Sequence, residues 1–195
     1  MATASNKPGL IRRMWRALMS PSARWSVFTL LLMGLIVGLV GTVGTQVMVH
    51  ATGTNQFCGT ACHSMQWVAA EHKKSTHGAN RYGVGASCSD CHIPHAYPGK
   101  LWYKTKAGVK DAIAESRGVI GTEALFKKER KRMAEHVWAE FRENDSANCR
   151  TCHVFTPEAL ALQKGGPRKD HQNRFAEKKT CIDCHKGVAH EEPAE

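Results

Sequence analysis

The chain has 195 residues, a formal net charge of +10, eight cysteines and eleven histidines. Positive charge of this size is common in nucleic-acid-binding proteins, but the sequence holds no basic helix and no aromatic platform motif, so we expect no nucleic-acid partner. The charge is unevenly divided, because residues 1–50 hold five basic residues and no acidic one. The remainder carries 22 of the 27 basic residues and all 17 acidic residues, a net charge of +5.

Residues 27–49 form an apolar run of 23 residues without a charge. A helix of that length measures about 35 Å, which exceeds the roughly 30 Å of a bilayer's hydrocarbon core. Basic residues precede the run, so residues 1–26 are predicted to be cytoplasmic, with Trp15 and Trp25 at the membrane interface. The alternative is a signal peptide cleaved near Val49-His50-Ala51, but the apolar part of a signal peptide is only about 7–15 residues long. We therefore expect a single retained transmembrane anchor.

Within this run, Gly34 and Gly38 form a G-x-x-x-G pair on one helix face, continued by Gly41 and Thr45. Small residues at this spacing let two membrane helices pack closely, which indicates a homodimer or a partner helix. The alternative is that glycine is simply frequent in membrane helices.

Each of the eight cysteines belongs to a pair that is followed at once by a histidine. This is the pattern of covalent haem attachment, in which two thiols bond the haem vinyl groups and the histidine reaches the iron. Motif one has three residues between its cysteines, whereas motifs two to four have the strict spacing of two. In order, the motifs are Cys58, Cys62 and His63; Cys88, Cys91 and His92; Cys149, Cys152 and His153; and Cys181, Cys184 and His185.

Four such motifs predict four covalently bound haem c groups. Zinc ribbons also use cysteine pairs, but they do not need a histidine directly after each second cysteine. Haem is attached beyond the bacterial inner membrane, so we expect residues 50–195 to be a periplasmic tetrahaem domain. Four haems would add about eight propionate carboxylates, which offset much of the excess positive charge.

Only eight residues separate Val49 from Cys58. Even when fully extended they reach about 30 Å, so the first haem is predicted to lie close to the outer surface of the membrane.

No alternating strand pattern of useful length is present, which predicts a mainly α fold of short helices and loops packed around the haems. We expect helices over 100–120 and from Thr122, an N-cap, to Asn144. A further helix should begin at Thr156-Pro157 and end at residues 165–167. Residues 191–195 have the composition of a frayed acidic tail.

Seven histidines lie outside the motifs, a surplus that sixth iron ligands would require. With His92, His153 and His185 as proximal ligands, we favour His77, His171 and His190 as distal ligands. His190 follows His185 by only five residues, so it should serve a different haem. The alternative for any one of them is an ordinary surface histidine.

The anchor, the layout of the four motifs, and residues 144–149 and 181–190 resemble the NapC/NirT family of membrane-anchored tetrahaem quinol dehydrogenases. The resemblance implies that electrons pass from membrane quinol, menaquinol or ubiquinol, to a periplasmic terminal reductase of the nitrate or nitrite type, or to a soluble cytochrome. It also implies that Met65 binds the first iron in place of His63, but the extra residue in motif one leaves both open. His77, His171 and His190 match family histidines expected to be distal ligands.

The same resemblance matches Lys104 and Asp111 to a lysine and an aspartate near the quinol site. Seven residues apart on a helix, they would share one face about 10 Å apart along its axis. Asp111 could take a quinol proton, and Lys104 could hold a developing quinol anion. The alternative is a solvated pair of charges on an ordinary helix.

Three other functions remain open on the sequence. The chain could be an electron-relay or storage cytochrome without a quinone site, a quinone reductase running in reverse, or a catalytic multihaem enzyme with an open iron position. The histidine surplus argues against the last of these. No fifth motif or further domain follows, so we expect a tetrahaem protein rather than one of the pentahaem relatives.

Overall fold

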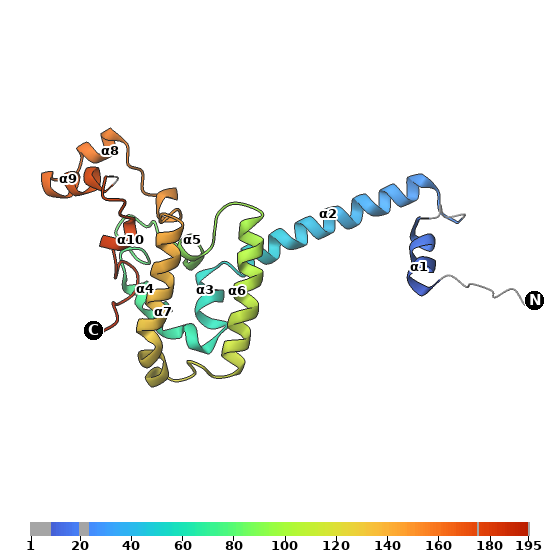
Figure 1. The fold of residues 1–195 in the computed structure, drawn as a ribbon, viewed down its shortest axis with the longest axis horizontal. Coiled ribbons are helices and arrows are strands. Elements are labelled where there is room, and N and C mark those ends of the chain that lie inside the picture. Colours follow the sequence, from blue (N-terminus) through green and yellow to red (C-terminus); the bar gives the residue numbers. More distant parts are fainter. Residues whose placement is uncertain (1–8, 20–23, 175, 195) are drawn as a thin grey trace, which may run out of the picture. The chain divides into compact units, whose positions relative to one another are not determined.

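The computed structural model describes residues 9–19, 24–174 and 176–194, with the side chains of residues 17–19 left aside, and it is helical with no strand in these ranges (Figure 1). Two units can be distinguished, residues 1–47 and 48–195. The predicted mainly α class is therefore confirmed.

The first unit holds α1 (Leu10–Met19) and most of α2 (Val27–Ala51). In the part of the chain that the structure describes, α2 is the one helix long and apolar enough to cross a membrane. Its side chains are not buried by the protein, and Thr42 and Thr45 satisfy their hydroxyl groups by donating to backbone carbonyls one turn back, each at 2.8 Å. The predicted apolar helix is present and extends two residues further than the sequence indicated.

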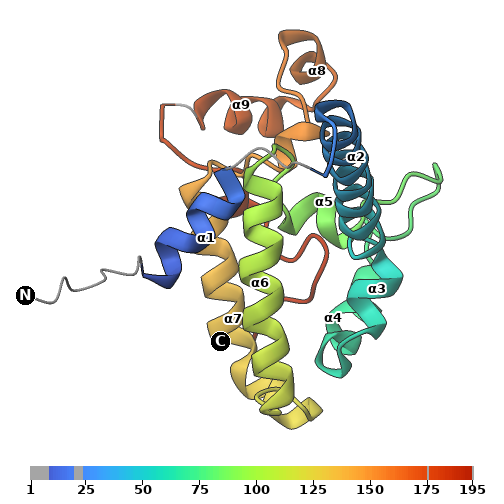
Figure 2. The same cartoon turned by 90° about the vertical axis from the view of Figure 1, so that its right-hand side faces the viewer.

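The second unit is built from two long helices, α6 (Gly99–Ser116) and α7 (Glu123–Glu143), which run in opposite directions (Figures 1 and 2). Short helices carry the motifs: α3 packs against both α4 and α5, and α10 packs against α7. The short elements are α3 (Asn55–Thr60), η1 (His63–Met65), α4 (Gln66–Lys74), α5 (Cys88–His92), η2 (Cys149–Thr151), α8 (Pro157–Ala161), α9 (Gly165–Asn173) and α10 (Cys181–Cys184).

Two predicted helix starts are confirmed by their caps. The Thr122 hydroxyl accepts from the Leu125 amide at 3.3 Å, and Thr156 caps α8 in the same way, with Pro157 in the first turn. Helix α6 ends at Ser116, four residues before the predicted end, because Gly118 turns the chain at a φ of 63°.

The prediction that residues 165–167 end a helix is wrong. Helix α8 already ends at Ala161, and residues 165–167 form the first turn of α9. Proline fits there because the first amides of a helix have no carbonyl partner within it.

Protein side chains bury little apolar surface. Among the described residues only Phe126 and Ile182 are buried hydrophobics, and Phe126 stacks on Trp67 with 5.2 Å between ring centroids. A domain of this size normally encloses a larger apolar core. The other buried side chains among the described residues are polar, namely Ser64, His72, Ser146 and Arg174.

Candidate haem-binding site

Motifs two and four each form one short helix, and residues next to their cysteines cap its start. In α5, Ser87 and Asp90 form a capping box, in which each side chain bonds the backbone amide of the other. Thr180 and Asp183 do the same in α10. Because residues three apart in a helix are neighbours, this turn brings the two cysteines of each motif onto the same side.

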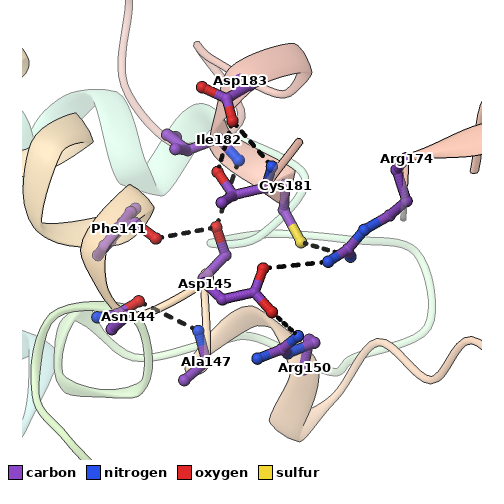
Figure 3. A network of polar contacts seen from close by, with 11 residues as sticks. Phe141, Asn144, Asp145, Ala147, Arg150, Arg174, Cys181, Ile182 and Asp183 are labelled. Carbon is purple, nitrogen blue, oxygen red and sulfur yellow. Dashed lines mark hydrogen bonds and ion pairs between the residues drawn. The ribbon is translucent and has the colours of Figure 1, made fainter. Parts of the chain in front are cut away.

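Motif three is held by a tight turn that precedes it. Asp145 and Ser146 both have left-handed backbone conformations, with φ values of 51° and 49°. Such values are uncommon outside glycine and persist only where surrounding contacts fix them. Ser146 is 1% exposed, and its hydroxyl accepts from the Ile182 amide of motif four at 3.4 Å (Figure 3).

The carboxylate of Asp145 extends this link between motifs three and four. It accepts from the guanidinium groups of Arg150 and Arg174, the latter at 3.1 Å (Figure 3). Arg174 also donates to the Cys181 sulfur at 3.8 Å. On the other side, the Asn148 amide donates to the Cys91 carbonyl at 2.7 Å, which joins motif three to motif two.

The cysteines themselves show the order of the motifs in space. The Cys88 thiol donates to Cys58 and lowers the pKa of Cys58 to about 7, so motif two lies beside motif one. Burial raises the pKa of Cys149 to about 11, and the neighbouring Cys181 contributes to that rise. The charge of Cys152 acts on Cys91. Neighbouring motifs are therefore in contact from one to four.

Each histidine of motifs two to four faces a second histidine ring. Ring centroids are 6.2 Å apart for His92 and His190, 6.1 Å for His153 and His77, and 5.8 Å for His185 and His171. Two metal–nitrogen bonds of about 2 Å plus the two ring radii amount to roughly 6 Å. These three pairs therefore fit an iron ligated by two histidines.

In two of the three histidines that lie outside the motifs, the ring nitrogen that would face away from the iron has a hydrogen-bond partner. His77 donates through Nδ1 to the Val188 carbonyl at 3.2 Å, and His171 donates through Nδ1 to the Gln163 side-chain oxygen at 2.7 Å. Such a bond fixes the tautomer and leaves Nε2 free to act as a ligand. Burial lowers the pKa of His92 to about 4, which keeps its imidazole neutral, as a ligand must be.

Motif one is built differently. The ring of His63 contacts Trp67 edge-on at 5.7 Å, and its Nε2 lies 3.1 Å from the Gln66 side-chain nitrogen. Met65, two residues on, is 38% exposed. Between them, Ser64 is buried, and its hydroxyl donates to the carboxylate of Glu115 on α6.

Glu115 was not identified from the sequence. Its carboxylate accepts from the Ser64 hydroxyl and from the backbone amides of His63 and Ser64, and these bonds lower its pKa, the hydroxyl most. The amides belong to the start of the η1 turn, where no helical carbonyl can reach them. Only its position one turn after Asp111 on an expected helix could have indicated it.

The predicted pair Lys104 and Asp111 lies on α6 beside motif one. Lys104 donates to the Val49 carbonyl at 3.1 Å, and burial lowers its pKa. Asp111 lies at an exposed position, but partial desolvation of its carboxyl raises its pKa. Its charge acts on Cys62. Cys58 lies next to the same end of α2, since its thiol is 4.0 Å from the Thr52 carbonyl.

Four histidines remain. His50 lies in the last turn of α2, and the other three have other surroundings. His95 bonds the Asp90 carbonyl at 3.0 Å, and His136 lies 3.6 Å from the carboxylate of Glu140 at the surface. His72 is buried on α4, where its charge would act on His92 and His190. None of the three has a motif histidine as its ring partner in the described part of the chain.

Comparison with known proteins identifies the group to which this arrangement belongs. A family model described as the NapC/NirT cytochrome c family, N-terminal region, matches residues 20–195. The chain belongs to the NapC/NirT cytochrome c family. The resemblance inferred from the sequence is thus confirmed, and the chain is a c-type cytochrome of this family.

Two relatives match over nearly their full length. NapC of Escherichia coli strain K12 is 39% identical over 194 residues, which cover 99% of this chain and 96% of NapC. The tetraheme c-type cytochrome CymA of Shewanella oneidensis is 39% identical over 196 residues, which cover 92% of this chain and 98% of CymA.

Two further matches show a longer relative and a solved structure. TorC of E. coli strain K12 is 42% identical over 188 residues, which cover 94% of this chain but 47% of TorC, so the chain spans about half the length of TorC. The crystal structure of the cytochrome c nitrite reductase NrfHA complex bound to the HQNO inhibitor contains a chain of 29% identity. The match has a TM-score of 0.50 and covers 83% of this chain and 90% of that one.

Proposed function

We propose that this chain is a membrane-anchored tetrahaem cytochrome c that oxidises membrane quinol and passes the electrons to a periplasmic reductase or a soluble cytochrome. The proposal rests on a contrast between the motifs. The histidines of motifs two to four each face a second histidine at iron-ligating distance, whereas motif one lies beside the end of α2 with Lys104 and Asp111. The relative CymA is described as a tetraheme cytochrome, which supports four haems here.

The eight cysteines would hold four haem c groups by thioether bonds. Haem c, when bound, takes up and passes on single electrons. The ring pairs support His190, His77 and His171 as distal ligands that complement His92, His153 and His185, in that order. In motif one, Nε2 of His63 is already next to the Gln66 amide, so the Met65 sulfur is the group that would hold the first iron.

Quinol oxidation releases two electrons and two protons, so its site needs a proton acceptor. Asp111 suits this role because partial burial raises its pKa and lets its carboxylate hold a proton nearer to neutral pH. Lys104 is fixed by the Val49 carbonyl at the end of α2, where it can stabilise an anionic quinol oxygen. Both residues would therefore meet quinol where the anchor leaves the membrane.

The proposed location follows from α2 and from the charge before it. The chain is a single-pass protein of the bacterial inner membrane, with its N-terminus in the cytoplasm and residues 50–195 in the periplasm. A homodimer through Gly34 and Gly38 stays a prediction. A reductase of the nitrate or nitrite type is the proposed partner, since the similar solved chain belongs to a cytochrome c nitrite reductase complex and NirT is described as a denitrification system component.

Reduction by a quinol analogue tests the proposal. The intact mass of the purified protein should exceed the chain mass by four haem masses. Under anaerobic conditions, a menaquinol analogue should reduce the haems to the extent that its reduction potential allows. A relay cytochrome without a quinone site would be reduced by dithionite but not by quinol. A quinone reductase running in reverse would oxidise its pre-reduced haems with quinone much faster than it accepts electrons from quinol.

A further inference from the structure

A partly buried ion pair joins α4 to α7. Arg130 contacts Glu71 through two parallel hydrogen bonds of 2.6 and 2.8 Å, and the two side chains are 15% and 14% exposed. The Arg130 guanidinium also lies over the ring of the core residue Phe126, 5.3 Å from its centroid. Two-pronged pairs of this kind hold both side chains in one orientation.

The same pair holds the segment that was predicted to be a frayed tail. The Glu191 amide donates to the Glu71 carboxylate at 3.1 Å, and Arg130 donates to the Glu191 carbonyl. The prediction is therefore wrong at Glu191, because an ion pair from two other helices binds its backbone. This attachment fixes the position of the preceding residue, His190.

His190 lies between the ion pair and motif two. Its Nδ1 is 3.9 Å from the Glu71 carboxylate, and its ring is 6.2 Å from that of His92. Its Nδ1 is buried without a hydrogen bond within 3.5 Å, unlike the Nδ1 atoms of His77 and His171. Of the charged or titratable groups that act on His190, namely Glu71, His72 and Arg130, the Glu71 carboxylate acts most strongly.

We infer that Glu71 and Arg130 are positioning residues that seat His190 against motif two and set the reduction potential of that haem. The inference rests on the proposed role of His190 as an iron ligand. A carboxylate behind a ligating imidazole strengthens the ligand and favours the oxidised, more positive iron. The guanidinium opposes this effect, but its charge acts on His190 less strongly than that of Glu71, so the net contribution of the pair is a lower potential.

Substitutions at the two positions should move the potential in opposite directions. Glu71→Gln keeps the shape of the side chain and removes its negative charge, so the potential of one haem should rise. Arg130→Gln leaves the Glu71 charge unbalanced, so the potential of the same haem should fall. We expect about a tenfold change in the reduction equilibrium of that haem in each case, or about 59 mV for one electron. A spectroelectrochemical titration measures both.

Matched controls lie on the same helix. Glu129 and Arg132 form a surface pair at 2.6 Å, so Glu129→Gln and Arg132→Gln make the same charge changes away from His190. Both should leave all four potentials as in the wild type. Arg130→Lys keeps the charge and should stay much closer to the wild type than Arg130→Gln.

His190→Ala separates this inference from the ligand assignment. If that variant keeps every low-spin signal of the wild type, the assignment of His190 fails. If it converts one haem to high spin while Glu71→Gln and Arg130→Gln leave that haem's potential unchanged, the inference alone fails. Shifts of both variants in one direction, accompanied by high-spin haem, would also overturn it, because they would indicate only a loosened tail.

Discussion

The histidine of motif one and those of motifs two to four lie in different surroundings. Each of the latter three faces a second imidazole about 6 Å away, whereas His63 faces Trp67 and Gln66. Motif one instead has charged partners from α6, namely Lys104, Asp111 and Glu115. A site closed by two histidines suits electron relay, and a site bordered by a carboxyl with a raised pKa suits exchange of electrons and protons with a substrate.

The largest expected effect is loss of one histidine from a pair. His77→Ala, His171→Ala and His190→Ala should each convert one of the three histidine-paired haems from low to high spin, because the sixth ligand is lost. Electron paramagnetic resonance of the oxidised protein measures the change. The surface variant His136→Ala should keep the wild-type spectrum, and an unchanged spectrum in His171→Ala would remove that residue from the ligand set.

Asp111→Asn tests whether motif one is the site of quinol oxidation. Quinol-driven haem reduction should slow by about 10²–10⁴-fold, the usual contribution of a general base, while dithionite reduction stays unchanged. In the wild type the rate should rise with pH as the carboxyl loses its proton. Burial raises the pKa of Asp111, so this rise should lie above the usual carboxyl range. Glu135→Gln, at an exposed position of α7, is the acid-to-amide control.

The link between motif one and α6 should have a smaller effect. Glu115→Ala removes the acceptor for the Ser64 hydroxyl and two backbone amides, so Met65 should lose its fixed position. We expect about a tenfold slower quinol reaction and a broadened signal from the first haem. Glu115→Gln should be milder because it keeps one acceptor oxygen. Equal rates in the wild type and Glu115→Ala would show that this link does not position the site.

The smallest effect concerns stability around motif four. Arg142 donates to Asp183 at 2.7 Å and lowers the pKa of that carboxyl to about 2. Because the folded pKa is below the unfolded value near 4, this stabilisation is present above pH 4 and is lost as pH falls towards 2. Arg142→Gln should lower the free energy of unfolding at pH 7 by less than about 1 kcal/mol. It should also flatten acid unfolding between pH 4 and 2, as measured by circular dichroism.

Much of the fold could be predicted from local signals. The apolar run predicted α2, and capping residues predicted the starts of α7 and α8. These features depend on residues close together in sequence. The start of α9 was missed because Gly165-Gly166-Pro167 is compatible with either a helix end or a first turn. Short-range signals cannot decide between the two.

The site was predictable where covalent chemistry imposes spacing and not where contacts are long-range. The cysteine motifs fixed eight positions, and counting histidines indicated a surplus. However, the pairing of His190 with His92 joins residues 98 positions apart, which no local pattern reveals. Glu71, Glu115 and Arg130 are ordinary helix-surface residues in the sequence, and only tertiary contacts distinguish them.

Removing the haem of motif one tests most directly whether electrons enter there. In Cys58→Ala/Cys62→Ala, the intact mass should show three haems, and the low-spin signals of motifs two to four should be retained. If quinol is oxidised at motif one, a menaquinol analogue will no longer reduce these three haems, whereas dithionite will reduce them all. Reduction of the three remaining haems by quinol at the wild-type rate would contradict the proposed entry point.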